Sequence, residues 1–337
     1  MRLPRRALTL VVLLLVAAPV LAHVPAFPDD NDSPARAVEV PDPVKSWSFY
    51  DSLGEGGVAY YRARLAPGER FTVGTFTPDS TAFTPSLVVM SPALEARGSV
   101  PPGVTVPDGM APVVVAGDRP QSPSYEPFAP SANFQTARFE HTVDAERTYL
   151  IAVYEPENRT GPAGVVVGFE EAFSPTEYLA VPVDLVRVRL WEGQSPLLAL
   201  GPFLLTVLGG AGLLGREWRD GDGAGPLRWT LAGAGLLVLG SGVNTAVQTV
   251  LALARTGVTP GALVTAVFVA VPVLGGTWGI TRARRPAWRL TPRQRVGLGI
   301  VGALSLLTWA GFIVGPVVLL GLAVVPSRAV PTTRTGD

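Results

Sequence analysis

The sequence predicts an all-β sandwich, jelly-roll-like in type, followed by an α-helical transmembrane region of four spans. Short runs of alternating apolar and polar residues fill the first half of the chain, a pattern typical of strands with one buried face. Long apolar runs fill the second half, and each is long enough to cross a bilayer. Charge divides the chain at the same place.

The two halves differ sharply in their charged residues. Residues 23–195 hold 23 acidic and 12 basic side chains, whereas residues 196–337 hold 4 acidic side chains and 12 arginines. This asymmetry indicates that the two parts meet different surroundings. The acidic part argues against nucleic acid as a partner, because phosphate binding needs clustered basic residues. The chain has no Cys, which excludes disulfides and thiol chemistry.

Residues 1–22 carry the pattern of a secretory signal peptide. Arginines at the start precede an apolar run, and Val20 and Ala22 suit the positions before a cleavage site. Cleavage after Ala22 would make His23 the first residue of the mature chain. The alternative is an uncleaved anchor helix, which would be short for a membrane span.

Residues 23–172 are predicted to form the extracytoplasmic β-sandwich, and the stretch VAYYRARL (58–65) shows its pattern best. Alternation predicts an inner set of Ala59, Tyr61, Ala63 and Leu65 and an outer set of Tyr60, Arg62 and Arg64. Residues 66–69, Ala-Pro-Gly-Glu, predict a type II turn. Phe71 and Val73 continue the inner face in the next strand. Further predicted strands cover residues 86–90, 112–116, 135–142, 148–154 and 164–169, and the Pro-rich residues 91–133 predict a long loop region.

Residues 173–195 are predicted to form a membrane-proximal amphipathic helix. Ser174 and Glu177 have the spacing of a capping box, and Pro175 suits the first helical turn. The apolar residues that follow carry a charged stripe, so we expect this helix to lie at the membrane surface with Trp191 near the headgroups. An amphipathic strand is the alternative.

Four apolar runs predict the transmembrane helices, at about 196–215, 229–254, 259–281 and 296–325. With residues 23–195 outside, nine arginines fall on the inner side and three on the outer side, in agreement with the positive-inside rule. The prediction is a multi-pass protein of the cytoplasmic membrane. The sandwich and the short tail, 326–337, would both lie outside.

The run EGGVAYYRARLAPGERFTVGTFTPDSTAFTPSLVVMSP resembles the first half of bacterial and archaeal pre-peptidase C-terminal domains. RTYLIAVYEPENRTGPAGVVVGFEE is similar to their closing hairpin. The resemblance covers roughly residues 50–170 without the Pro-rich section, and Ala63 stands where an aromatic residue is usual. It implies a jelly-roll-like binding or accessory module and no catalytic residues. The whole layout looks like that of uncharacterised archaeal membrane proteins.

Two groups of residues are candidate metal ligands. His23, as a mature N-terminus, would offer an amine and an imidazole, and with His141 it would complete a copper-binding set of nitrogen ligands. The ordinary interpretation of His141 is an exposed or hydrogen-bonded strand residue. Asp29, Asp30 and Asp32 form an oxygen-rich cluster suited to calcium, although the Gly-bearing calcium-loop pattern is absent and such loops are commonly just solvated.

Asn31 and Asn158 begin N-glycosylation sequons on the predicted outer side. In the second predicted span, Asn244 and Gln248 are four residues apart and share a face. Hydrogen bonding between packed helices explains this polar patch better than a transport path, because no charged residue or His lies inside a predicted span.

The predicted function is a non-enzymatic, membrane-anchored surface protein that presents a β-sandwich binding or accessory module. No nucleophile-elbow, zincin or phosphate-loop motif occurs in the sequence. Besides the bilayer, the expected partner is a protein or glycan at the outer face, a membrane-complex subunit or a second copy. The alternatives are a copper-binding or redox accessory protein that uses His23, and a small transporter or channel component.

Overall fold

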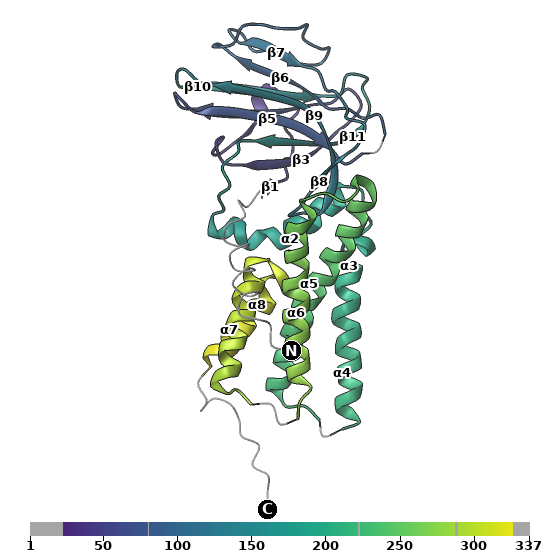
Figure 1. The fold of residues 1–337 in the computed structure, drawn as a ribbon. Helices are drawn as coiled ribbons and strands as arrows, with labels where there is room; N and C mark the ends of the chain where they lie inside the picture. Colours follow the sequence, from purple (N-terminus) through teal and green to yellow (C-terminus); the bar gives the residue numbers. More distant parts are fainter. Residues whose placement is uncertain (1–22, 80, 222, 287–288, 326–337) are drawn as a thin grey trace, which may run out of the picture. The chain divides into compact units, whose positions relative to one another are not determined.

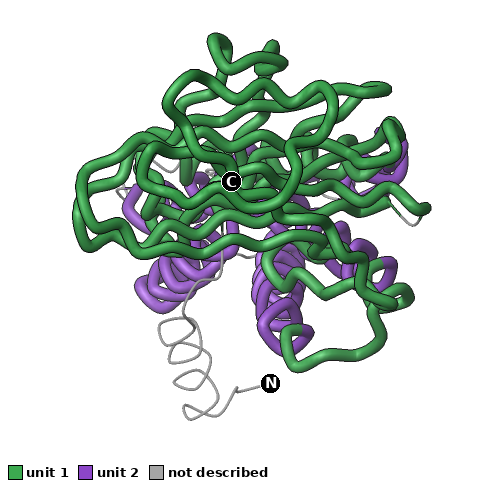
Figure 2. Tube along the Cα trace, turned by 90° about the horizontal axis from the view of Figure 1, so that it is seen from above, with its two compact units in different colours: residues 1–193, 252–261 green, residues 194–251, 262–337 purple. Residues whose placement is uncertain are grey.

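The computed structural model describes residues 23–79, 81–221, 223–286 and 289–325. The predicted signal peptide and the predicted outer tail lie outside these residues. The chain forms two compact units, drawn in green and purple in Figure 2. Unit 1 runs up to Gly193 and includes Ala252–Gly261, and unit 2 holds Gln194–Leu251 and the chain from Ala262 on.

Unit 1 contains two β-sheets. One has the strand order β1 (Val24–Ala26), β3 (Trp47–Leu53), β11 (Gly161–Val167), β5 (Arg70–Thr77), β9 (Ser131–Thr142) and β8 (Ser124–Glu126). The other has the order β2 (Val38–Glu39), β4 (Val58–Leu65), β10 (Arg147–Tyr154), β6 (Ser86–Ser91) and β7 (Ala111–Val115). A short 3-10 helix, η1 (Pro34–Arg36), precedes β2. Neighbouring strands are antiparallel except β1–β3 and β2–β4.

The inner faces of both sheets share one core. Tyr61 of β4, Phe71 of β5, Ile151 of β10 and Val165 of β11 all have no exposed surface. The predicted inner set of β4 is therefore confirmed. Within the turn 66–69, Gly68 has a φ of 84°, the left-handed value that a type II turn requires at its third position.

The prediction that Tyr60 faces solvent is wrong. Tyr60 is 1% exposed and packs with Val88, Met90 and Leu150 in a second cluster on the outer face of this sheet. The Pro-rich segment covers that face, contributing Val104, Val106 and Met110. The later part of the Pro-rich segment is not a plain loop, because it contains β8 and the start of β9.

Helix α2 (Pro175–Trp191) follows the sandwich and begins with the capping box that the sequence predicts. Lys45 Nζ forms an ion pair of 2.6 Å with Glu177, and both side chains are largely buried. Trp191 does not point outward as expected for a headgroup contact. Its Nε1 donates to the carbonyl of Asp51 at 2.5 Å, and its ring lies 4.9 Å from that of Tyr50.

Within the residues that the structure describes, three helices are long and apolar enough to cross a membrane. The first comprises α3 (Pro196–Leu204), a π-helical turn η2 (Leu205–Gly209) and α4 (Gly210–Arg219). The others are α5 (Pro226–Thr256) and α6 (Ala262–Ala283).

The predicted fourth span is wrong, because its apolar run breaks in the middle. It forms α7 (Pro292–Leu307), a short 3-10 turn η3 (Ala310–Ile313) and α8 (Val314–Val324). Gly311 and Phe312 have φ values of 62° and 51°, which no right-handed helix contains. Pro316 then lies in the first turn of α8, where proline is tolerated because it does not meet the carbonyl of a preceding helical turn.

Candidate functional site

A pocket of about 480 Å³ lies in unit 1, where the loop after β1 meets the β3–β4 turn. Its walls come from residues 27–32, 50–54 and 57–59. They include all three aspartates that the sequence suggested for calcium, Asp29, Asp30 and Asp32. With Asp51, four aspartates therefore line this pocket.

Asn31 holds the loop of the pocket in place. Its side chain is turned inward, with the residue 6% exposed, and Nδ2 donates to Asp51 Oδ2 at 3.0 Å. Its carbonyl accepts the backbone N–H of Tyr60 at 2.7 Å. Asp30 has a φ of 54°, and this left-handed residue lets the aspartates on either side of Asn31 remain exposed.

Asp51 is the fixed carboxylate of the pocket. Its Oδ2 also accepts the phenolic O–H of Tyr61 at 2.7 Å, and its Oδ1 accepts the N–H of Ser52 at 2.7 Å. Burial, and next the negative charge of Asp51, hold the pKa of Tyr61 well above its usual range. Tyr61 therefore stays protonated and remains a donor to Asp51.

The loop aspartates give the pocket mouth its negative charge. Asp32 pairs with Arg36 at 2.5 Å, whereas Asp29 and Asp30 form no ion pair within the described ranges. Carboxylates at a concave surface attract cationic groups. Among the residues that the structure describes, no three His, Asp or Glu side chains are arranged to hold a metal ion, so the aspartates line the pocket without converging on one point.

The two histidines lie on separate strands. His23 precedes β1, and its Nδ1 hydrogen-bonds Ser46 Oγ. His141 is in β9, opposite Phe71 of β5. Three strands separate β1 from β9 in the sheet, so these two strands are about 19 Å apart across it at the usual strand spacing. Burial lowers the pKa of His23. This fold does not bring the two imidazoles into one copper site.

The two sequons differ in accessibility. Asn31 is buried and its amide nitrogen is hydrogen-bonded, so a glycan there would require the pocket loop to open. Asn158 is exposed in the β10–β11 turn, with a φ of 59°. Of the two asparagines, Asn158 is the accessible acceptor.

The two residues of the polar patch of α5 have different surroundings within unit 2. Gln248 is 2% exposed and exchanges two amide hydrogen bonds with Gln194, at 2.8 and 3.0 Å. Asn244 differs, because its buried Oδ1 has no hydrogen-bond partner among the described residues. Gln248 therefore hydrogen-bonds to the segment that precedes α3, and its role in helix packing stays a prediction.

A second charged cluster, which the sequence did not reveal, lies between α2 and β8 in unit 1. Arg189 and Glu192 form an ion pair of 2.9 Å, with side chains 6% and 8% exposed. Burial, with a smaller contribution from the charge of Glu171, raises the pKa of Glu126 to about 7, against the opposing effects of the hydrogen bond from the Phe128 N–H and the charge of Arg189. The charge of Arg189 in α2 thus acts on Glu126 in β8 without a direct ion pair between them among the described contacts.

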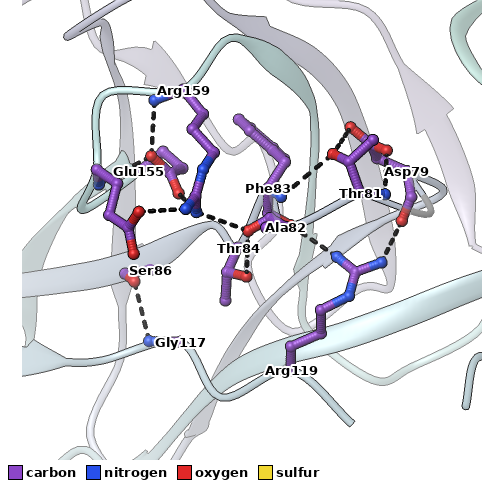
Figure 3. Close-up of polar contacts among 11 residues, drawn as sticks. Asp79, Thr81, Ala82, Phe83, Thr84, Ser86, Gly117, Arg119, Glu155 and Arg159 are labelled. Carbon is purple, nitrogen blue, oxygen red and sulfur yellow. Dashed lines mark hydrogen bonds and ion pairs between the residues drawn. The ribbon is translucent and has the colours of Figure 1, made fainter. Parts of the chain in front are cut away.

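The β5–β6 loop is held by arginines, as Figure 3 shows. Arg119 donates to the carbonyls of Asp79 and Phe83, the latter at 2.8 Å. Arg159 donates to the carbonyl of Ala82 at 2.9 Å and to the buried carboxylate of Glu155 at 3.2 Å. These contacts satisfy carbonyl groups of the loop, so we interpret them as structural.

No family model and no curated protein matches this chain. Among solved structures, one similarity is to PliG of Aeromonas hydrophila, a periplasmic lysozyme inhibitor of g-type lysozyme. The identity is 15% and the TM-score 0.25, over 44% of this chain and 100% of that one. A similarity this weak gives no functional information.

Proposed function

We propose that this chain is a non-enzymatic, membrane-anchored surface protein that displays its β-sandwich outside the cytoplasmic membrane as a binding or accessory module. The order of the parts along the chain carries the proposal. The first segment of unit 1, which contains the β-sheets and their core, ends at Gly193, and an apolar helix of 24 residues begins at Pro196. The loops that follow the first and third apolar helices are rich in arginine, and such loops stay on the cytoplasmic side. The sandwich precedes the first of these helices and would therefore lie on the outer side.

The acidic pocket is the proposed contact point with a partner. Its fixed carboxylate, Asp51, and its exposed carboxylates, Asp29 and Asp30, suit the basic side chains of a protein at the outer face. Asp51 is held in place by hydrogen bonds, and Asp29 and Asp30 add exposed negative charge. This arrangement favours binding of one defined basic group over nonspecific electrostatic attraction. The resemblance to pre-peptidase C-terminal domains is consistent with such an accessory role.

Co-purification from native membranes tests this proposal. Chemical cross-linking, solubilisation and mass spectrometry should recover a partner with the wild-type chain, and recovery should fall at least several-fold with Asp29→Asn/Asp30→Asn. Asp108→Asn is the matched control, because Asp108 is exposed on the Pro-rich segment and lies outside the pocket. Equal recovery with all three chains would rule out the pocket as the contact point. A glycan partner would appear instead as retention on a cell-surface polysaccharide, lost in the same double variant.

A further inference from the structure

The last apolar run of the chain is folded back on itself. α7 and α8 pack side by side, as Figure 1 shows in yellow. A Cβ at Gly299 would lie 3.9 Å from Cβ of Ala323, and one at Gly302 would lie 2.9 Å from Cγ of Leu320. From Gly299 to Gly302 the residue number rises along α7, whereas that of the contacting residue in α8 falls, from Ala323 to Leu320. The two helices form an antiparallel hairpin whose tip is η3.

Neither arm of the hairpin is long enough to cross a bilayer. α7 has 16 residues and α8 has 11, which correspond to about 24 and 17 Å of helix, against about 30 Å of hydrocarbon. Arg293 and Arg295 lie in the first turn of α7 and mark that end as the headgroup end. Arg295 donates to the carbonyls of Ala323, at 3.2 Å, and Val325, so the end of α8 lies beside the start of α7.

The tip of the hairpin contacts the middle of a spanning helix. The N–H of Gly311 donates to Ser241 Oγ at 2.7 Å, and Ser241 lies at the centre of α5. A Cβ at Gly315 would lie 3.2 Å from the carbonyl of Ala234, also in α5. Backbone groups at membrane depth need a partner inside the protein, and Ser241 supplies one to the turn. The tip therefore lies near the mid-depth of α5.

Helix α6 gives a second measure of depth. A Cβ at Gly297 would lie 3.0 Å from the Trp278 ring, near the end of α6 that precedes the arginine-rich loop. A Cβ at Gly275 would lie 2.8 Å from Val301 Cγ1, closer to the middle of α6. The base of the hairpin thus lies at the arginine-rich end of α6.

We propose that α7 and α8 form a re-entrant hairpin that enters and leaves the membrane on the same, arginine-rich side, so that the chain after α8 lies on that side. Eleven of the 12 arginines after residue 195 then share one side, and only Arg255 is on the other. Four spans would divide them nine to three. Exposed apolar side chains of the hairpin would contact the acyl chains of one leaflet: Val296, Ile300, Leu307, Val314, Val317 and Val324.

Cysteine pairing tests the hairpin itself, and the Cys-free chain provides a clean background. In the full chain in native membranes, Gly299→Cys/Ala323→Cys should form a disulfide on mild oxidation, because Cβ atoms 3.9 Å apart satisfy disulfide geometry. The control pair Gly299→Cys/Val317→Cys should not. In one continuous helix, residues 299 and 323 would be about 36 Å apart and could not pair. Failure of the first pair to cross-link, with normal expression, would overturn the hairpin.

Labelling of intact cells tests the sidedness with a membrane-impermeant maleimide. A Cys added after Asp337 should react only after permeabilisation, as should Gly225→Cys in the α4–α5 loop, whereas Asp108→Cys should react at once. Reaction of the added Cys together with Asp108→Cys in intact cells would overturn the re-entrant topology. Assignment of the arginine-rich side to the cytoplasm rests on the proposed function. A reversed pattern, with only Asp108→Cys protected, would refute the outer display of the sandwich and leave the hairpin supported.

Discussion

The phenolic oxygen of Tyr60 accepts a hydrogen bond of 2.8 Å from the backbone N–H of Thr105. This contact fastens the Pro-rich segment to the outer face of the β4 sheet. It also explains why a residue in an outer position of an alternating strand is buried. The segment acts as a cover for half of the sandwich, and the stability of the fold should depend on it.

Truncation of Tyr60 should therefore be as costly as truncation of the core. We expect Tyr60→Ala, like Phe71→Ala, to lower the free energy of unfolding by about 3–5 kcal/mol. Tyr60→Phe should cost about 1 kcal/mol, because it removes one hydrogen bond and retains the ring. The measurement is denaturant unfolding of the full chain in detergent. Arg64→Ala is the control, since Arg64 is exposed in the same strand and its ion pair with Glu146 is solvated; a comparable loss there would contradict the assignment.

The alternation in residues 58–65 predicted the inner face of β4 correctly because period 2 reports which residues share a face. The same period does not show whether the outer face of β4 is covered by another part of the chain. The cover comes from the Pro-rich segment, which is distant in sequence and has no periodic signal. Helix α2 could be predicted down to its capping box because Ser174 and Glu177 interact locally.

The pocket was visible in the sequence only through its aspartates. Strand β3, which contributes Asp51, was missed because aromatic residues occupy both of its faces, Phe49 on the inner and Tyr50 on the outer, and hide the alternation.

The break at Gly311 and Pro316 was missed because apolar length alone does not distinguish one long helix from two short ones. The spacing of Gly and Pro in the run WAGFIVGP was the available signal.

The raised pKa of Glu126 predicts a pH-dependent stability. Its ordinary pKa is 4.5, and burial raises it to about 7 in the folded chain, so between these values the folded state holds a proton that the unfolded state releases. This contribution to stability is complete below pH 4.5 and is lost as pH rises through about 7. It amounts to no more than about 3 kcal/mol.

Glu126→Gln should remove that dependence. Relative to the variant, the wild-type melting temperature in detergent should fall between pH 5 and 7 and then level off above pH 8. Glu146→Gln, which changes an exposed carboxylate, is the charge-matched control. Parallel profiles for wild type and Glu126→Gln would show that this carboxylate is ionised throughout.

Arg119 should control the order of the β5–β6 loop. Arg119→Met removes both carbonyl contacts and its stacking on Phe134 at 3.8 Å, so amide exchange in residues 81–84 should accelerate at least tenfold by mass spectrometry. Arg119→Lys supplies only a point charge and should give an intermediate rate. Exchange in β10 should not change. A uniform acceleration across unit 1 would indicate global destabilisation rather than release of this loop.

Helices α5 and α6 approach closely in unit 2 at two glycines, Gly235 of α5 and Gly276 of α6. A Cβ at Gly276 would lie 2.6 Å from the carbonyl of Gly235 and 2.5 Å from the N of Leu239, so even a methyl group must push the helices apart. Small residues permit such close approach between membrane helices, where packing replaces the hydrophobic effect as the driving force.

Gly276→Ala should therefore destabilise unit 2, whereas Gly233→Ala, on the same helix as Gly235, should be tolerated because its Cβ would meet nothing within 4 Å. We expect the melting temperature of the full chain in detergent to fall by several degrees for Gly276→Ala and to stay the same or rise for Gly233→Ala, since alanine favours helix over glycine by about 1 kcal/mol. The change should appear in the fluorescence of Trp278, two residues from the contact. Equal melting temperatures for the two variants would mean that α5 and α6 do not cross at these glycines.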